Sequence, residues 1–431
     1  MPNALHLPVR CSLAARALSI AALVATGSAS AQTVIQLDGT VNLNYNVTTP
    51  AAPGRANLFL EIRPAVAFQT GSPRLVLRLA YMFVGDLGLD GSWSNTYSNQ
   101  LSASLAAQPD DRSTVTFGAT LVQGDTAFQL SQQPADTGQP AFRPVGSPAQ
   151  VTGTLVQTFL WEATADLRLS QALTGRVVAP QYALDQSNAS VTGLVSLDRM
   201  GPTDSYGAEF TPSVARLRQS TVAMEPFWSV INTLLARWNH DFDSGWNGGL
   251  TGGVSHVMTF TEDNPRAVVP AGSLAARYVY GSAGGALSLD LGPRTDLQTG
   301  TVSQNAQATL RGFLNFDALW PRQLSGSAGF LHTWPLGAVT PGSAAGIGDA
   351  LQGDLGLLWG VSDALIASAR YSVAYQFNQP AGIAPSLVHV FLVGFTARYS
   401  NAPFLPPMPT AGNRVDGGDG VPFPGVPSTR Q

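Results

Sequence analysis

The chain has 431 residues, of which only 12% are charged, about half the usual share for a globular protein. It contains no lysine, so all 23 basic side chains are arginine. The formal net charge of −4 argues against a nucleic-acid-binding protein, which normally shows a concentrated basic patch.

Residues 1–31 have the three-part order of a secretory signal peptide. Arg10 and Arg16 form the basic region, residues 17–26 form the apolar region, and residues 29–31 (A-S-A) form a cleavage site of the A-x-A type. An N-terminal core helix is the alternative. We therefore expect this segment to direct export across the inner membrane and then to be removed.

Cleavage would fall between Ala31 and Gln32, where the mature chain would begin. The single cysteine, Cys11, lies in the segment that would be removed. The mature chain is therefore expected to have no disulfide, no thiol nucleophile and no cysteine metal site. Loss of the two arginines of the signal peptide leaves 21 basic against 27 acidic residues, a net charge of −6.

Alternation of apolar and polar residues dominates the rest of the chain. In residues 34–47 the apolar side chains stand mainly at odd-numbered positions and the polar ones at even-numbered positions. Residues 58–68, 75–83 and 365–377 show a similar alternation. Successive side chains of a strand point to opposite faces, so each segment predicts a strand with one apolar and one polar face.

The mature chain lacks the run of roughly 18 apolar residues that a membrane-spanning helix needs. Many strands with one apolar and one polar face favour an all-β fold, a transmembrane antiparallel up-and-down β-barrel with lipid outside and a polar lumen inside. We expect residues 32–400 to form about 18 strands, with 16 as the alternative. A soluble secreted β-sandwich or propeller is the alternative at the level of the fold.

Connections of two lengths separate the predicted strands. The shorter ones are predicted at residues 70–73, 108–112, 170–173, 241–245, 320–323 and 360–363. The longer ones are predicted at residues 86–92, 125–150, 185–205, 261–272, 337–349 and 378–385. Outer-membrane barrels have short periplasmic turns and long external loops, so a periplasmic start at Gln32 would place the longer connections outside.

The least regular part of the pattern is residues 205–228. There A-E-F-T-P-S-V-A (208–215) matches L-E-I-R-P-A-V-A (60–67), with Glu and Pro in register. The match favours a strand over a loop, whether it reflects an internal duplication or two strands with similar patterning. Pro64 and Pro212 each remove a ladder hydrogen bond, so a bulge or a rim position is predicted for both.

Aromatic residues gather near the predicted strand ends, as in the girdles of membrane barrels, although a soluble β core would also bury them.

The end of the chain has two further features. In the last predicted strand, residues 387–399, Gly394 and Tyr399 partly resemble the C-terminal signal for the barrel assembly machinery. Residues 401–431 are rich in Pro, Gly and Asp and predict a disordered periplasmic tail. Docking of a periplasmic partner is the alternative role of this tail.

Charged residues on the predicted lumen faces are the first candidates for a functional site. They are Asp38, Glu61, Arg63, Arg78, Glu162, Asp166, Arg168, Glu209, Arg237, Asp241, Arg311, Arg370 and Arg398. One interpretation is a mixed-charge pore lining that filters solutes. The other is that these groups solvate the wall or pair across strands in a narrow lumen. Asp38 and Glu61, near Arg63 and Arg78, predict an ion-pair cluster on the inner wall.

Neither a catalytic nor a metal site is indicated, and no cofactor is predicted. The sequence contains no G-x-S-x-G elbow and no H-E-x-x-H pattern. His240, His256 and His389 fall on predicted outer faces, and His332 falls at an aromatic-rich strand end. Residues 416–420 (D-G-G-D-G) are a lone Gly/Asp turn, more consistent with a flexible acidic linker than with a calcium site.

The signal peptide and the alternation over residues 32–400 resemble those of bacterial outer-membrane β-barrel proteins. The resemblance implies an outer-membrane location with the lipid bilayer as the surroundings. The length and the strand count also resemble the barrels through which some bacteria export polysaccharide, and sugar-selective porins. These resemblances imply a channel for transport or export of small solutes or of polysaccharide.

Three functions follow from this interpretation. Barrels of 16–18 strands leave an aqueous channel, so passive or partner-assisted transport is the first hypothesis. The loop predicted at residues 125–150, with Asp125, Asp136 and Arg143 as its charged residues, would narrow the channel if it folded inward. A structural or adhesive anchor without an open pore is the second hypothesis. An outer-membrane enzyme using His332 or a rim aspartate is the third, and we expect the chain not to be an enzyme.

Overall fold

The computed structural model is an all-β barrel of 18 strands. It describes residues 32–49, 58–72, 74–89, 96–124, 150–181, 183, 186–218, 225–242, 245–261, 266–297, 300–316, 322–336, 348–362, 364–377 and 385–401. The strands are β1 (Gln32–Thr49), β2 (Leu58–Ser72), β3 (Leu75–Gly88), β4 (Thr96–Asp110), β5 (Ser113–Gly124), β6 (Gln150–Thr164), β7 (Leu167–Pro180), β8 (Asn188–Met200), β9 (Asp204–Leu217), β10 (Phe227–Phe242), β11 (Trp246–Phe260), β12 (Arg266–Tyr280), β13 (Ala283–Asp296), β14 (Thr301–Phe316), β15 (Arg322–Pro335), β16 (Gly348–Ser362), β17 (Leu365–Phe377) and β18 (Ser386–Ser400).

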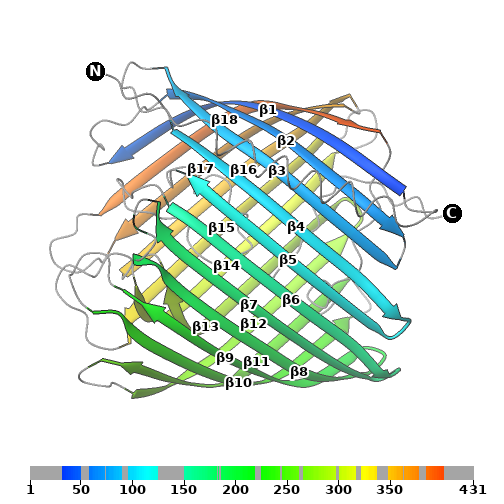
Figure 1. The fold of residues 1–431 in the computed structure, drawn as a ribbon, viewed down its shortest axis with the longest axis vertical. Helices are drawn as coiled ribbons and strands as arrows, with labels where there is room; N and C mark the ends of the chain where they lie inside the picture. Colours follow the sequence, from blue (N-terminus) through cyan, green and yellow to red (C-terminus); the bar gives the residue numbers. More distant parts are fainter. Residues whose placement is uncertain are drawn as a thin grey trace.

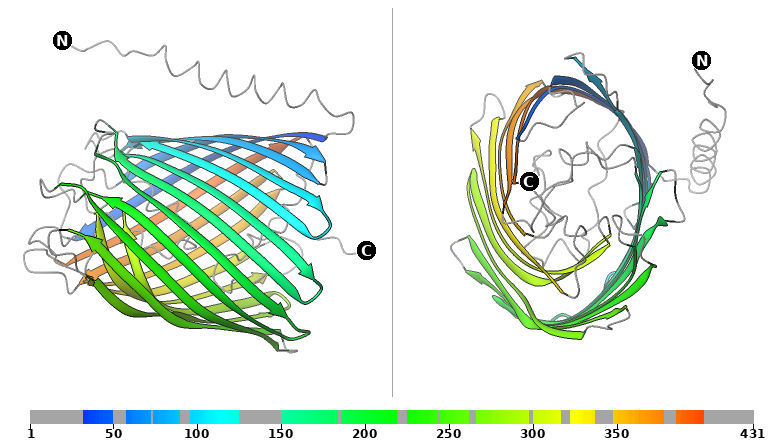
Figure 2. Two further views of the ribbon diagram at one scale, coloured as in Figure 1. Left: turned by 60° about the horizontal axis from the view of Figure 1, so that its bottom comes forward. Right: turned by 90° about the vertical axis from the view of Figure 1, so that its left-hand side faces the viewer.

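The sheet closes on itself. Each strand pairs antiparallel with the next one along the chain, and β1 pairs with β18 from Gln36 opposite Ser400 to Thr49 opposite Leu387. Figure 1 shows the tilted strands from the side, and the end-on view in Figure 2 shows a closed oval. The predicted fold and the predicted strand number are therefore confirmed. Among the described residues, no helix is long and apolar enough to cross a membrane.

Side chains separate by polarity between the two faces of the wall. In β1 the odd-numbered Leu37, Val41 and Leu43 are exposed on the outside, whereas the even-numbered Asn42 and Asn44 are buried on the lumen side. The same alternation in the other strands produces a continuous apolar outer surface. A surface of this kind is stable only in contact with lipid, since no apolar layer of the described chain covers it.

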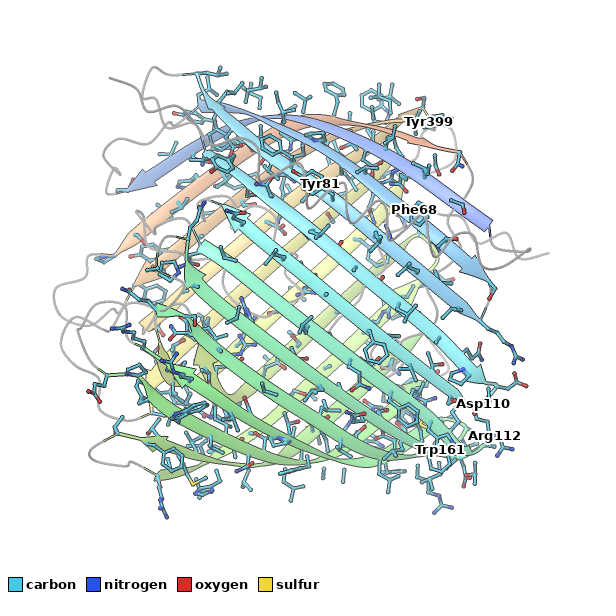
Figure 3. The ribbon with its side chains drawn as sticks, viewed as in Figure 1. Phe68, Tyr81, Asp110, Arg112, Trp161 and Tyr399 are labelled. Carbon is cyan, nitrogen blue, oxygen red and sulfur yellow. The ribbon has the colours of Figure 1, made fainter. Side chains whose placement is uncertain are left out.

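Aromatic residues lie almost entirely on the outer face. Figure 3 shows Phe68, Trp161 and Tyr399 toward the end of the barrel that carries the short turns. By strand alternation, the aromatic residues of the described strands at inward positions are Phe59, Phe227 and Phe313. A soluble β core would bury its aromatic residues, so this distribution matches the interfacial girdles of a membrane barrel.

The outward position of Leu155 provides a test of the lipid-facing surface. Leu155 lies in the central part of β6 and exposes 65% of its surface, and the adjacent Thr154 faces the lumen. We expect Leu155→Arg to lower the free energy of unfolding in liposomes by about 2–4 kcal/mol, because the arginine would enter the hydrocarbon layer. Thr154→Arg is the matched control and should cost much less. Equal losses for the two variants would contradict the assignment of faces.

The short connections alternate with the long ones, as the sequence predicts, but three boundaries are wrong. Residues 170–173 lie inside β7, and the actual turn is at Ala165 and Asp166. Residues 188–200, placed in a long loop, form β8, and residues 266–272, also placed in a loop, begin β12. Small polar residues produced these errors, because Ser, Asn, Thr and Gly are ordinary inward-facing residues in a water-filled barrel.

Pro64 and Pro212 occupy strand interiors, so the predicted bulge or rim position is wrong for both. The β2–β3 ladder skips the pairs that would contain Arg63 and Pro64. The β8–β9 ladder likewise skips two pairs, Gly193 with Pro212 and Leu194 with Thr211. Each proline lacks the N–H for one ladder bond. The other neighbouring strand stays paired, and the register continues unchanged past the gap.

Several expectations concern segments outside the described residues. They are the signal peptide and its cleavage site after Ala31, most of the loop at residues 125–150, and the tail from residue 402 onward.

Candidate functional site: the lumen wall and an inward hairpin

Charged side chains on the inner wall form short-range ion pairs across neighbouring strands. Arg398 of β18 donates to Asp38 of β1 at 3.0 Å, which links the first and last strands. Arg370 of β17 donates to Asp354 of β16 at 2.5 Å. Because most of these charges are neutralised within the wall, the described lumen surface is polar with a small net field.

The predicted cluster of Asp38, Glu61, Arg63 and Arg78 is divided in the structure. Asp38 pairs with Arg398, and Glu61 pairs with Arg63 at 2.5 Å. Arg78 lies opposite Gln69 near the short-turn end of the barrel, away from Glu61. The prediction of one cluster is wrong, because the register places Asp38 opposite Ala65 and not opposite Glu61. The charged residues are therefore separated along the barrel axis.

Arg237 of β10 is the centre of a network of charged residues on the inner wall. Its Nη1 lies 3.1 Å from an oxygen of Glu209 on β9, and its Nε lies 3.9 Å from an oxygen of Asp198 on β8. The side chains of Arg237 and Asp198 are 8% and 4% exposed. One arginine thus forms ion pairs with two acidic residues on two strands. Sequence analysis found Arg237 and Glu209 but missed Asp198, because residues 185–205 were assigned to a loop.

The remaining predicted lumen residues occupy different positions. Glu162 and Arg168 pair across β6 and β7 at 3.5 Å. Arg311 stands at an inward position of β14, and Asp241 is exposed at the short-turn rim. Asp166 lies in the β6–β7 turn and not on the wall. There a hydrogen bond from the Thr164 hydroxyl holds the pKa of the Asp166 carboxyl below its usual value.

Sequence reasoning missed a structural element at the long-loop end of the lumen. We call it the inner hairpin; it consists of the end of β13 (residues 292–296), the turn residues Leu297 and Gly300, and the start of β14 (residues 301–303). In the end-on view of Figure 2 a yellow-green hairpin leaves the wall and points into the lumen. Gly300, with φ of +69°, makes the turn together with a hydrogen bond from its N–H to the carbonyl of Asp296.

Two facing prolines explain why the inner hairpin leaves the wall. The β12–β13 ladder ends with Gly272 opposite Leu291, although both strands continue. The same register would place Pro270 opposite Pro293. The carbonyl of Pro270 accepts a hydrogen bond from Nε2 of Gln304 on β14, so the backbone of Pro270 faces that side of β12. A hydrogen-bonded pair at this position needs an N–H from each residue, and neither proline has one.

The inner hairpin packs on an apolar patch of the inner wall. Leu297 and Val302, 5% and 6% exposed, contact a cluster of inward-facing residues near the long-loop ends of four strands. These wall residues are Val178 of β7, Ala215 and Leu217 of β9, Ile231 of β10 and Val257 of β11. Phe59 and Val84 are further buried apolar residues at inward positions, outside this patch. Burying each hairpin anchor against the patch contributes about 1.5–3 kcal/mol.

A polar contact fixes the far end of the inner hairpin. Nδ2 of Asn188, at the start of β8, donates to the carbonyl of Leu297 at 2.7 Å, and its Oδ1 accepts from the backbone N–H of Arg218. Asn188 lies five strands away from β13 in the barrel. The hairpin thus forms a chord from β13 to β8, with Leu297 and Val302 against the wall.

Restoring the missing backbone donors should release the inner hairpin. We expect Pro270→Val with Pro293→Val to permit two more ladder bonds, worth about 0.5–1.5 kcal/mol each. That gain corresponds to a roughly 5- to 150-fold shift in population toward the extended wall. A Leu297→Cys reporter, in a chain beginning at Gln32, should then react faster with a water-soluble maleimide. Pro212→Val is the control and should leave the rate unchanged. An unchanged rate in the double variant would contradict the role of the prolines.

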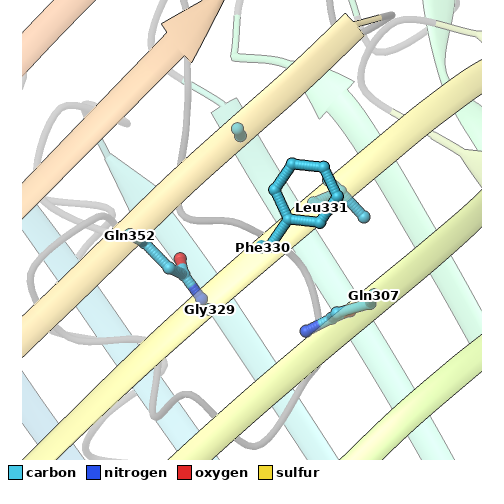
Figure 4. Close-up of a pocket in the computed structure, with 6 residues that line it drawn as sticks. Gln307, Gly329, Phe330, Leu331 and Gln352 are labelled. Atoms are coloured by element: carbon cyan, nitrogen blue, oxygen red, sulfur yellow. The ribbon is translucent and has the colours of Figure 1, made fainter.

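The inner face of the described wall carries a shallow recess. This shallow recess lies on the inner face between Gln307, Leu331 and Gln352, over the backbone of Gly329 (Figure 4). Its volume of about 10 Å³ is that of roughly one water molecule. The recess is therefore too small for a solute much larger than water.

The histidines that sequence analysis considered stand outside the lumen. His240 of β10 bonds Asp204 of β9 at 2.8 Å, and His332 of β15 bonds Asp349 of β16. These two histidines and their aspartate partners are at outward positions near the rims. Within the described residues no group of three or more His, Cys, Asp or Glu side chains could hold a metal ion.

A closed 18-stranded barrel with an apolar exterior and a polar interior defines a class: a membrane-spanning β-barrel of the bacterial outer-membrane type. No family model matches the chain, and no curated protein matches it.

Among solved structures, the outer membrane protein OpdK of Pseudomonas aeruginosa is 11% identical with a TM-score of 0.43, over 85% of this chain and 99% of that one. The FrpB iron transporter of Neisseria meningitidis is 8% identical with a TM-score of 0.42, over 84% and 81%. A bacterial polysaccharide outer membrane secretin is 9% identical with a TM-score of 0.37, over 85% and 98%. At these values the likeness does not extend to a substrate.

Proposed function

We propose that this chain is a diffusion channel for small polar solutes in the outer membrane of a Gram-negative bacterium. The observation that carries the proposal is the polar inner wall of a closed 18-stranded barrel, since barrels of this size enclose an aqueous channel. Inward-facing hydroxyl and amide side chains, such as the bonded pair Thr116 and Thr158, hydrate the wall along its length. Such a wall favours small hydrophilic solutes.

The wall chemistry also indicates what the channel discriminates. Most of the described inner charges belong to ion pairs such as Arg237 with Glu209 and Arg370 with Asp354. A channel whose wall charges are paired with each other is expected to discriminate only weakly between cations and anions. The scarcity of inward aromatic residues leaves few ring faces for a sugar to pack against. The inner hairpin supplies the constriction, so solute size is the main criterion for passage.

Planar-bilayer recording tests the proposal. The chain beginning at Gln32 is refolded in detergent, checked for the heat-dependent gel mobility of folded barrels, and added to one side of the bilayer. Stable single-channel steps with weak ion selectivity are the expected result. Added sugars and polysaccharides should cause little blockade, and strong blockade would move the proposal to saccharide transport or export. A folded barrel that stays silent would contradict the channel and favour an anchor without an open pore.

A further inference from the structure

Polar side chains interrupt the deep part of the lipid-facing surface on one side of the barrel. In the described strands, outward Asn, Gln, His, Ser, Thr, Asp, Glu and Arg residues occupy, with four exceptions, the two outward positions nearest a strand end. Positions of that kind lie near the headgroups, where water reaches them. The four exceptions stand deeper, and all belong to the adjoining strands β6 to β11: Gln157, Gln171, Asn232 and His256. We call them the deep polar residues.

Gln157 and Gln171 form a reciprocal hydrogen-bonded pair. Nε2 of Gln171 donates to Oε1 of Gln157 at 3.1 Å, and Nε2 of Gln157 donates to Oε1 of Gln171 at 3.4 Å. Gln157 is the eighth of the 15 residues of β6, so it lies near the middle of the bilayer. An amide has two N–H donors and two acceptor lone pairs. The mutual bonds therefore leave each glutamine with a further N–H and a further lone pair.

A second polar pair lies three strands further round the wall. Asn232 of β10 stands directly opposite His256 of β11. Asn232 lies four residues inside Trp228, and Gln157 lies four residues inside Trp161, both of which are exposed outward tryptophans. Outward tryptophans mark the membrane–water interfaces of a barrel. Both pairs are therefore inside the hydrocarbon layer.

The wall between the two pairs is low and its ladder is interrupted. The ladder partner of Gln157 is Leu173, whose other partner is Gly193. Gly193 belongs to the pairs that the β8–β9 ladder skips, and a Cβ there would lie 3.3 Å from Cγ of Pro212. Gly193 thus makes room for the proline ring. Small residues at the surface let two membrane proteins approach closely.

Lipid cannot satisfy the deep polar residues. Acyl chains contain no hydrogen-bond donor or acceptor, so each free amide group that faces them is destabilising. A lipid-facing surface of the ordinary apolar type offers no partner either. A second copy of this chain does, because it has the same orientation in the membrane and carries amide and imidazole donors and acceptors within the same hydrocarbon layer.

We propose that the outer face of β6 to β11 binds a second copy of this chain within the membrane. The outward N–H groups and lone pairs of the deep polar residues form the hydrogen bonds between copies, and the low surface at Gly193 permits close packing. The contact is independent of whether the lumen conducts, since an anchor without an open pore would present the same outer face.

The number of copies in each assembly tests the proposal. The chain beginning at Gln32 receives one dye on a cysteine added at its C-terminus, is refolded into liposomes, and is followed by single-molecule photobleaching. We expect more than one bleaching step in most assemblies. Gln157→Leu with Gln171→Leu should raise the dissociation constant roughly 10-fold or more. The same variant should fold at least as stably in liposomes, because leucine is favourable in lipid. A fall in association therefore cannot come from misfolding.

A matched pair of tryptophan variants locates the contact. Val195 of β8 is the ladder partner of Gln171 and is 46% exposed, and Val393 of β18, on the far side of the ring, is 57% exposed. Val195→Trp should weaken association, whereas Val393→Trp should leave it unchanged, since lipid accommodates the larger side chain. Single copies at every protein-to-lipid ratio would overturn the proposal. Unchanged association in the leucine variant, or equal effects of the two tryptophans, would do the same.

Discussion

Replacing residues 294–303 with a two-residue Asn-Gly turn is expected to raise single-channel conductance several-fold and to admit larger solutes. Pro293 and Gln304 face each other in the β13–β14 ladder, so a tight turn can join them without shifting the register. The replacement removes the chord between β13 and β8. It also exposes the apolar patch that Leu297 and Val302 cover, so stability should fall by about 1.5–3 kcal/mol for each lost anchor.

Leu297→Met is the control for the hairpin replacement. Methionine preserves an apolar anchor of similar volume, a change that well-packed cores tolerate, and conductance should remain at the original level. An unchanged conductance in the shortened chain, measured on protein that is folded by gel mobility, would show that the inner hairpin does not limit the channel. The constriction would then have to come from another part of the chain.

Arg237→Met is expected to cause the largest loss of stability of any single change on the described wall. The substitution leaves the acidic groups of Asp198 and Glu209 without the arginine that neutralises both. Removing one partner of a buried ion pair costs about 3–5 kcal/mol, because the remaining charge is buried and uncompensated. Urea unfolding of the barrel in liposomes measures the loss.

Two further variants separate charge from packing at this network. The triple replacement Arg237→Met, Asp198→Asn and Glu209→Gln removes all the charges together and should recover much of the lost stability. Arg74→Met breaks a rim pair with Asp111 whose side chains are 63% and 84% exposed, so it should cost at most about 1 kcal/mol. Similar losses for Arg237→Met and Arg74→Met would contradict the importance of burial at Arg237.

The sequence by itself determined the class of fold and the orientation of most side chains. Alternation is a local property, so Leu37, Val41 and Leu43 could be assigned to lipid, and Asn42 to the lumen, without knowledge of any neighbouring strand. Strand number followed from the same pattern and agreed with the structure. It failed locally at β8, because a lumen face rich in Ser, Thr and Asn has the composition of a loop.

Tertiary structure alone decided which charges meet and where the lumen narrows. Both depend on register, and register is set by the whole closed ladder and not by any one segment. Asp38 pairs with Arg398, 360 residues away, only because β1 and β18 are neighbours in the ring. Pro270 and Pro293 are ordinary strand prolines in the sequence. They become the reason for the inner hairpin only when the β12–β13 register places them face to face, where neither can donate a hydrogen bond.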